Sequence, residues 1–212
     1  MSDQPKWMRD SAPGWRAFQR RHGLTPDGAP GLATLDAVVE LEGSEDITTE
    51  IPIVGPPRRT AGGRRIDWIV IHHNGTAGRD AADIRRWHMQ GKGWSDIGYH
   101  RVYLDGEQAG VMEEGRPLRR PGAHAEDFND HSLGYCLIGD GDERPFDEKQ
   151  VDRLRYDILA DLQTYGLTSA QVIGHREVNQ YVDPDAHQTL KDCPGRHFDL
   201  DAFRASLAPA TV

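Results

Sequence analysis

Four side chains in this sequence are of the types that bind a transition metal at a reactive site. His72 and His73 follow the apolar residues 66–71. His175 follows a second short apolar run, and Cys193 lies in a later polar segment. Zinc accepts imidazole nitrogens and a cysteine thiolate, and three such ligands leave a fourth position for water. The spacing from His175 to Cys193 fits no short zinc-finger pattern. These residues could therefore form a metal site or be ordinary polar residues at the surface.

Two short strands must position the histidines. Residues 66–71, Ile-Asp-Trp-Ile-Val-Ile, are mostly apolar and are soon followed by Asn-Gly, which predicts a strand buried on both faces. Residues 171–174, Gln-Val-Ile-Gly, predict a second strand that ends at His175. If these strands are neighbours that stop at the same edge of one sheet, His72 and His175 converge there, because a rigid strand fixes the direction of its terminal side chain.

Helices and buried strands alternate along the rest of the chain, which predicts an α/β fold with a mixed central β-sheet flanked by helices. The turn signal Asp105-Gly106 predicts a hairpin between two of the strands. The further predicted elements are a strand reached through 94–104, strands at 108–112 and 133–139, and a closing helix at 198–207.

Two helices carry clear boundary signals. The first is predicted over 80–90, with Ile84, Trp87 and His88 on one face, and Gly91 and Gly93 follow it. The second begins after Asp147, where Gln150 is placed to complete a capping box, and it ends at Gly166.

The composition bounds the classes of function. The chain has 212 residues, of which 37% are hydrophobic and 28% charged, and a formal net charge of -9. This acidic balance, without a long basic run, argues against a nucleic-acid partner. No apolar stretch approaches the ~18 residues of a membrane span, so we expect no membrane insertion. The two cysteines make no disulfide framework. We also expect the protein to be a monomer.

Residues 1–42 predict a small helical unit in front of the main domain. The segment 17–28, Ala-Phe-Gln-Arg-Arg-His-Gly-Leu-Thr-Pro-Asp-Gly, resembles the second half of the three-helix peptidoglycan-binding repeat of cell-wall hydrolases. The alternative is a helical hairpin that packs on the main domain. Residues 43–65, rich in proline, glycine and charge, predict a linker or a chain wrapped over the surface. Residues 66–212 form the predicted main domain.

Several motifs in the main domain share one resemblance, and their common order over 66–200 makes it specific. They resemble the zinc N-acetylmuramoyl-L-alanine amidases of the type-2 family, whose fold is shared with peptidoglycan recognition proteins, and most closely the short phage lysozymes that are amidases. The motifs are Ile71-His72-His73-Asn74-Gly75-Thr76, Ile84-Arg85-Arg86-Trp87-His88, Gly93-Trp94-Ser95-Asp96-Ile97-Gly98-Tyr99-His100, Gly122-Ala123-His124-Ala125, Asn129-Asp130-His131-Ser132-Leu133-Gly134-Tyr135-Cys136-Leu137-Ile138-Gly139, Gly174-His175-Arg176-Glu177-Val178 and Lys191-Asp192-Cys193-Pro194.

The resemblance implies a Zn²⁺ ion held by His72, His175 and Cys193. It also implies that Tyr99 and Lys191 are the catalytic pair. Zinc lowers the pKa of its water toward ~7 and polarises an amide carbonyl. The phenol and the ammonium group could both stabilise the oxyanion that develops, an effect worth ~3–4 kcal/mol per donor. The general base stays open between Tyr99 and the zinc-activated water.

Four other positions receive secondary roles. His124 and Asn129 fall in a loop that resembles the family's substrate groove, where they could bind peptide or sugar; bracing of the loop is the alternative. His73 is expected to pack beside the site without binding the metal. Cys136, inside a predicted strand, is expected to be a small buried hydrophobic side chain.

One departure from the family pattern concerns the third ligand. The segment 179–190 makes the connection between the second histidine and the cysteine longer than in the phage enzymes. It contains Asp183, Asp185 and His187, each of which could bind zinc. Cys193 remains the predicted ligand because the pattern Lys-x-Cys-Pro is retained around it.

We therefore expect a peptidoglycan hydrolase of the endolysin type, with bacterial peptidoglycan as its partner, that cuts the amide bond between N-acetylmuramic acid and L-alanine. The first residues lack the apolar core of a signal peptide. We expect synthesis in the cytoplasm and action on the wall after another protein has opened the membrane. The rivals are a zinc-free module that only binds muropeptide, a cytosolic amidase that recycles muropeptides, and a zinc-stabilised structural domain.

Overall fold

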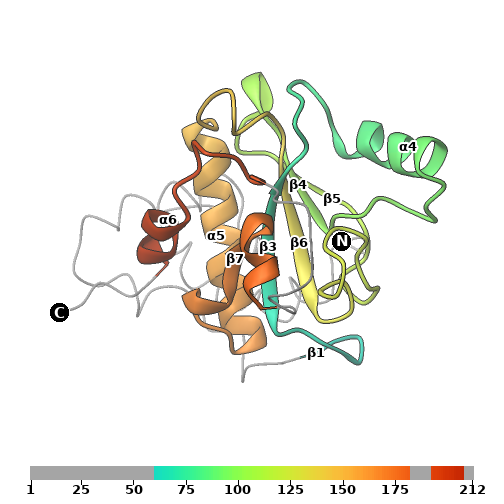
Figure 1. Cartoon of the computed structure of the whole chain (residues 1–212), viewed down its shortest axis with the longest axis vertical. Coiled ribbons are helices and arrows are strands. Elements are labelled where there is room, and N and C mark those ends of the chain that lie inside the picture. The colour runs from blue at the N-terminus through green and yellow to red at the C-terminus, as the bar shows by residue number, and fades with distance from the viewer. Residues whose placement is uncertain (1–59, 182–191, 208–212) are drawn as a thin grey trace, which may run out of the picture. The chain divides into compact units, whose positions relative to one another are not determined.

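The computed structural model describes residues 60–181 and 192–207. The predicted unit 1–42 and the predicted linker up to residue 59 lie outside the described residues. A five-stranded sheet in the order β5-β4-β6-β3-β7 forms the centre of the described part (Figure 1). Strand β5 is antiparallel to β4 and the other neighbouring strands are parallel, which confirms the predicted mixed sheet. The strands are β1 (Thr60–Ala61), β2 (Arg64–Arg65), β3 (Trp68–His73), β4 (Arg101–Tyr103), β5 (Met112–Glu114), β6 (Ser132–Leu137) and β7 (Val172–Gly174).

Helices flank this sheet, as predicted, and Figure 1 shows α5 and α6 on one side of it and α4 on the other. Within residues 60–181 and 192–207, none of the helices combines the length and hydropathy that a membrane crossing needs. The helices are α4 (Ala81–Gly91), α5 (Glu148–Tyr165) and α6 (Leu200–Ser206), with 3₁₀ turns η1 (Gly106–Gln108), η2 (Ser169–Gln171) and η3 (His175–Gln180).

Alternation along the central strands sends side chains into separate cores. Ile69 and Ile71 of β3 pack with α5 and α6 on one face of the sheet. Val70, between them, packs on the other face with Phe128. Cys136 of β6 is fully buried among apolar side chains on that second face, as predicted. Because successive strand residues point to opposite faces, the register of β3 decides which face each of its residues serves.

Helix α5 begins and ends where the sequence predicts, but the predicted capping box is wrong. The Asp147 carboxylate accepts a backbone N–H of the first turn at 3.0 Å. Gln150 does not reach back to this cap. Its side-chain amide donates to the carbonyl oxygens of Tyr103 (2.8 Å) and Ile138 (2.9 Å), because the helix turns Gln150 toward these buried strand ends. Gly166 ends the helix at φ 66°, a conformation that favours glycine.

The third predicted strand is displaced along the chain. The sequence places it at 108–112, whereas β5 begins at Met112. Residues 106–108 form η1 instead of a strand, so the connection from β4 is longer than a tight hairpin. The Asp105 carboxylate supports this loop by accepting the backbone N–H of Gly78 at 3.1 Å.

Residues 60–65, the end of the predicted linker 43–65, form the β1–β2 hairpin and pack on the domain. The Arg64 guanidinium donates to the carbonyl oxygens of Leu118 (2.7 Å) and Ser132 (2.9 Å). These charge-assisted hydrogen bonds tie the hairpin to the loop before β6. The folded domain therefore begins before residue 66.

Candidate metal centre and active site

The parallel pairing of β3 with β7 brings two histidines to one edge of the sheet. Ile71 pairs with Gly174, so His72 and His175 follow at the same level, as the two strand ends predict. Their ring centroids lie 4.5 Å apart. Strand alternation sends His72 to the face away from α5 and His73 to the opposite face. The two adjacent histidines therefore serve different environments.

Cys193 completes this cluster. One ligand atom from each of His72, His175 and Cys193 lies within 4.8 Å of the other two. Cys193 Sγ is 3.7 Å from His72 Nδ1, close to the about 3.6 Å that tetrahedral zinc imposes on a thiolate and an imidazole. Imidazole nitrogens and a thiolate are both ligands that zinc accepts, and three of them leave a fourth position for water, so the residues present fit this ion. The segment 179–190 offered three alternative ligands. These residues, Asp183, Asp185 and His187, lie outside the described residues.

The Cys193 loop contacts both the end of β3 and the loop that follows β6. The backbone N–H of His73 donates to Cys193 Sγ at 3.3 Å, and a hydrogen bond of this kind favours the thiolate. Behind the cysteine, Gly141 and Gly195 approach each other so closely that a Cβ on Gly195 would lie 2.1 Å from the Gly141 carbonyl carbon. The loop after β6 therefore sets the position of Cys193.

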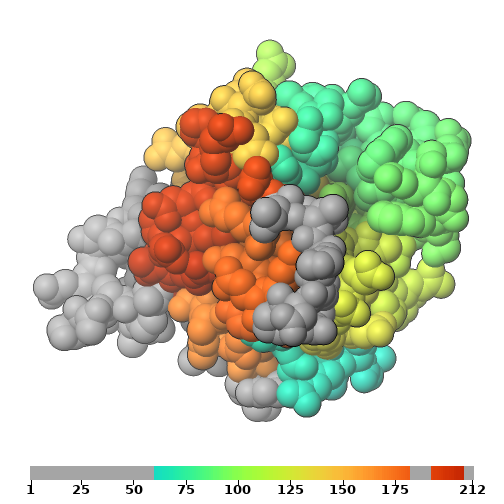
Figure 2. Space-filling view, viewed as in Figure 1, coloured from blue at the N-terminus to red at the C-terminus, as the bar shows by residue number. Residues whose placement is uncertain are grey.

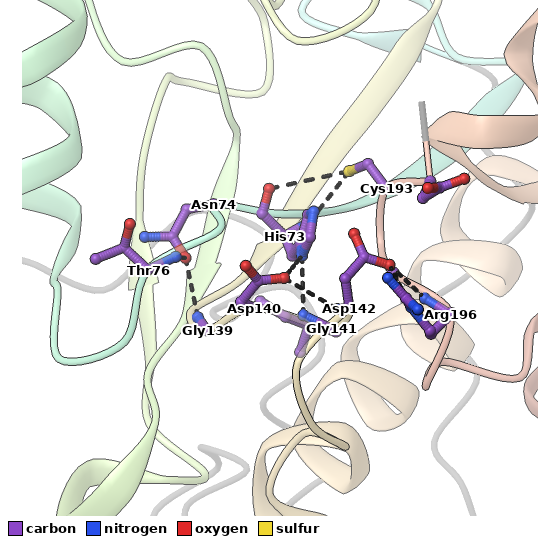
Figure 3. A network of polar contacts seen from close by, with 12 residues as sticks. His73, Asn74, Thr76, Gly139, Asp140, Gly141, Asp142, Cys193 and Arg196 are labelled. Carbon is purple, nitrogen blue, oxygen red and sulfur yellow. Dashed lines mark hydrogen bonds and ion pairs between the residues drawn. The ribbon is translucent and has the colours of Figure 1, made fainter. Parts of the chain in front are cut away.

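A second cluster of potential ligands, His73, Asp140 and Asp142, lies beside the first and also has its ligand atoms within 4.8 Å. These groups already have partners. His73 Nδ1 accepts the N–H of Gly141 and the Asp142 carboxylate accepts the N–H of Arg196, both at 2.9 Å. Burial lowers the pKa of His73, so its neutral ring can accept. Figure 3 shows these contacts linking the end of β3 to two loops, and we interpret the cluster as a brace for the metal centre.

Tyr99, to which the family resemblance gives a catalytic role, lies beside the cluster of His72, His175 and Cys193. Its ring centroid is 5.2 Å from that of His72. Burial raises the pKa of the Tyr99 phenol well above its ordinary value, and Cys136 and Cys193 act in the same direction. The phenol is therefore protonated at neutral pH and can donate a hydrogen bond. Lys191, its predicted partner, lies outside the described residues.

His124 and Asn129, predicted to bind substrate, both make their observed contacts within the protein: His124 is buried and Asn129 is half-buried. His124 is 8% exposed, and its Nδ1 lies 3.0 Å from His72 Nε2. Burial lowers the pKa of His124 well below its ordinary value, and His100 acts in the same direction. Asn129 Oδ1 accepts the backbone N–H groups of His124 (2.8 Å) and Ala125 (3.1 Å). This geometry favours the loop-bracing alternative for Asn129, and the contact between His124 and His72 is one that the sequence did not predict.

A hollow of about 470 Å³ opens beside Tyr99 and runs along α4. Arg79, Arg86 and Trp87 line it, and none of them was predicted as a site residue. Trp87 was predicted to share a face with Ile84 and His88, but those two side chains are buried whereas Trp87 is 58% exposed. Figure 2 shows α4 (green) standing along one side of the visible face. The sequence signal for this hollow was Trp87 directly after Arg86 in a segment predicted to be helical.

The fold and the cluster define an α/β domain with two histidines and a cysteine grouped so that they could hold a metal ion, beside an open hollow. The sequence profile of the N-acetylmuramoyl-L-alanine amidase family, Amidase_2, matches residues 62–196. The chain belongs to this family.

Individual relatives agree with this assignment. The chain is 34% identical over 101 residues to the endolysin of Escherichia phage T7, a match that covers 45% of this chain and 63% of that protein, less than two thirds of its length. It is 29% identical over 147 residues to peptidoglycan-recognition protein SC1a of Drosophila melanogaster, covering 64% and 71% of the two chains. The structure of the N-acetylmuramoyl-L-alanine amidase LysC from Clostridium intestinale superposes with a TM-score of 0.57 at 26% identity, over 72% of this chain and 90% of that one.

Proposed function

We propose that this chain is a zinc-dependent N-acetylmuramoyl-L-alanine amidase of the endolysin type, which acts on bacterial peptidoglycan. One observation carries the proposal: in a domain of this family, His72, His175 and Cys193 offer their ligand atoms within 4.8 Å of one another. These three residues would hold the zinc ion. When bound, zinc supplies Lewis acidity and an activated water for hydrolysis of the amide bond.

The chain's own donors would stabilise the charge that this reaction creates. When water attacks the amide carbon, negative charge develops on the carbonyl oxygen. The Tyr99 phenol, protonated and with its ring next to that of His72, could donate a hydrogen bond to that oxygen. Lys191 would supply a second donor, as the resemblance implies. The carbon–nitrogen bond then breaks, and the L-alanine amine leaves with an added proton.

The hollow along α4 suits the remainder of the substrate. Arg79 and Arg86 line it and are cations that could pair with carboxylates of a stem peptide. The ring of Trp87 is mostly exposed and could pack against the apolar face of a sugar or peptide. Because Tyr99 lines the same hollow, a substrate seated there would reach the metal centre.

Digestion of purified sacculi tests the reaction directly. Mass spectrometry should find stem peptides with a free L-alanine amino group and intact glycan strands. New reducing sugar ends would indicate a glycosidase, and cuts inside the stem would indicate an endopeptidase. Either result, without free L-alanine termini, contradicts the proposal.

The likeness to peptidoglycan-recognition protein SC1a supports one alternative function, that of a module that binds muropeptide without cutting it. The same sacculi separate the two. Sedimentation of the chain with the wall, without any released peptide in the presence of zinc, would support the binding module.

Tyr99→Phe should reduce kcat by about 10²–10³-fold while zinc stays bound, because one oxyanion donor is lost and no ligand changes. Release of stem peptide per unit time and bound zinc per chain are the two measurements. Tyr181→Phe is the matched control, since Tyr181 is exposed and packs on Trp68 at the opposite end of β3 from His72. A Tyr99→Phe variant with wild-type kcat would remove Tyr99 from the mechanism.

We also propose that residues 1–42 bind the cell wall, on the strength of their resemblance to the peptidoglycan-binding repeat. Deletion of residues 1–42 should weaken adsorption to sacculi, because a second binding unit raises the effective concentration at the wall. Cleavage of a soluble muropeptide should survive. Co-sedimentation gives the first quantity and product release the second. Unchanged adsorption would leave the unit with a packing role only.

A further inference from the structure

We propose that His124 is a positioning residue that fixes the tautomer of His72, so that His72 turns an unprotonated Nδ1 toward the metal centre. The proposal rests on the zinc site proposed above. His124 itself is buried, so it would act through His72 and not on the substrate. A chain of hydrogen bonds carries this assignment, and each proton in the chain can be placed.

The hydrogen bond between Ser132 and Phe128 fixes the donor and acceptor of the others. Ser132 Oγ lies 2.6 Å from the carbonyl oxygen of Phe128, and a carbonyl can only accept, so the hydroxyl proton is used there. Ser132 Oγ must therefore accept from His124 Nε2, which lies 3.4 Å away. With its proton on Nε2, neutral His124 presents an unprotonated Nδ1. That nitrogen accepts from His72 Nε2–H at 3.0 Å.

The same logic fixes the nitrogen that His72 offers to a metal. A neutral imidazole carries one proton, and in His72 this proton lies on Nε2. Nδ1 is then the unprotonated nitrogen, and it is the one that lies 3.7 Å from Cys193 Sγ. A metal requires an unprotonated nitrogen, and a partner on the other nitrogen of the ring fixes its orientation and raises its basicity.

Two glycines hold the His124 ring in place. A Cβ on Gly122 would lie 2.2 Å from His124 Cδ2, and a Cβ on Gly134 would lie 2.4 Å from His124 Cγ. Neither Gly122 nor Gly134 has a positive φ, so the backbone conformation does not require glycine at these positions. Their missing side chains make room for the ring. A ring enclosed in this way keeps its direction, as a positioning residue must.

The first test compares His124→Leu with His124→Asn in the full-length chain. Asparagine Oδ1 can replace Nδ1 as the acceptor for His72, whereas leucine fills the space without an acceptor. Competition with a chromophoric chelator should show zinc affinity about 10–100-fold weaker in His124→Leu. The His124→Asn variant and the control His131→Leu should stay near the wild-type affinity. Wild-type affinity in His124→Leu, or equal losses in the leucine and asparagine variants, would overturn the proposal.

The second test needs no metal. Nitrogen–proton correlation spectra of the metal-free chain should show His72 as the Nε2–H tautomer, and His124→Leu should populate both tautomers. An Nδ1–H tautomer of His72 in the wild type would overturn the proposal. If the leucine variant does not fold, Gly134→Ala provides the test, because its Cβ displaces the ring and should weaken zinc binding to a similar extent. A wild-type chain that binds no zinc but shows the expected tautomer would contradict the proposed function alone.

Discussion

Replacing His72 or Cys193 with alanine should remove bound zinc and wall lysis together. Their ligand atoms lie 3.7 Å apart, and each would supply one of three protein ligands. Zinc binding in zinc-finger peptides is worth ~10–16 kcal/mol, and the free energy is shared among the ligands, so loss of one of three ligands here should weaken binding by about a hundredfold or more. Metal analysis of the purified chain measures the zinc content, and peptide release from sacculi measures activity.

His73→Ala is the matched control, because His73 is the adjacent histidine on the opposite face of β3. The contacts of His73 with Cys193 Sγ come from its backbone N–H and its carbonyl oxygen, and alanine retains both groups. This variant should keep most of its zinc. Equal loss of zinc in His72→Ala and His73→Ala would contradict the assignment made from strand alternation. A zinc-free His72→Ala chain that still releases stem peptides would contradict the mechanism.

Asp161→Ala should lower the free energy of unfolding by about 3–5 kcal/mol, because it leaves a buried cation without its main partner. Arg101 of β4 and Asp161 of α5 form a two-point ion pair at 2.9 and 3.2 Å, with side chains 9% and 7% exposed. The Tyr135 hydroxyl also donates to the Asp161 carboxylate. The carboxyl group of Asp157 is 3.9 Å from Arg101, too far to replace this geometry.

Asp201→Ala is the control for this effect, since Asp201 pairs with Arg204 on α6 but has a side chain that is 93% exposed. Exposed pairs contribute about 0–1 kcal/mol, so this variant should unfold close to the wild type. Chemical denaturation followed by circular dichroism measures both. Equal stability of Asp161→Ala and Asp201→Ala would contradict the prediction. The double change Arg101→Met with Asp161→Leu should recover most of the loss, because it removes both buried charges.

The sequence by itself determined the elements that carry the centre. The apolar run before His72 and the run before His175 predicted two buried strands, and the structure pairs them in parallel with both histidines at one edge. Asp147 and Gly166 marked the ends of α5, because a capping carboxylate and a left-handed glycine act within a few residues of chain. Such signals depend only on neighbouring residues, so the sequence contains all the information that they need.

Contacts between remote segments were decided only by the tertiary structure. Period-two alternation implies that His72 and His73 face opposite ways, but the packing of α5 decides which face is left for the metal. The partners of His124 and Gln150 come from distant strands. His124 contacts His72, and Gln150 donates hydrogen bonds to strand carbonyl oxygens instead of capping its own helix. A side chain's hydrogen-bond partner depends on which segments the fold brings within about 3 Å, and spacing along the chain does not encode that distance.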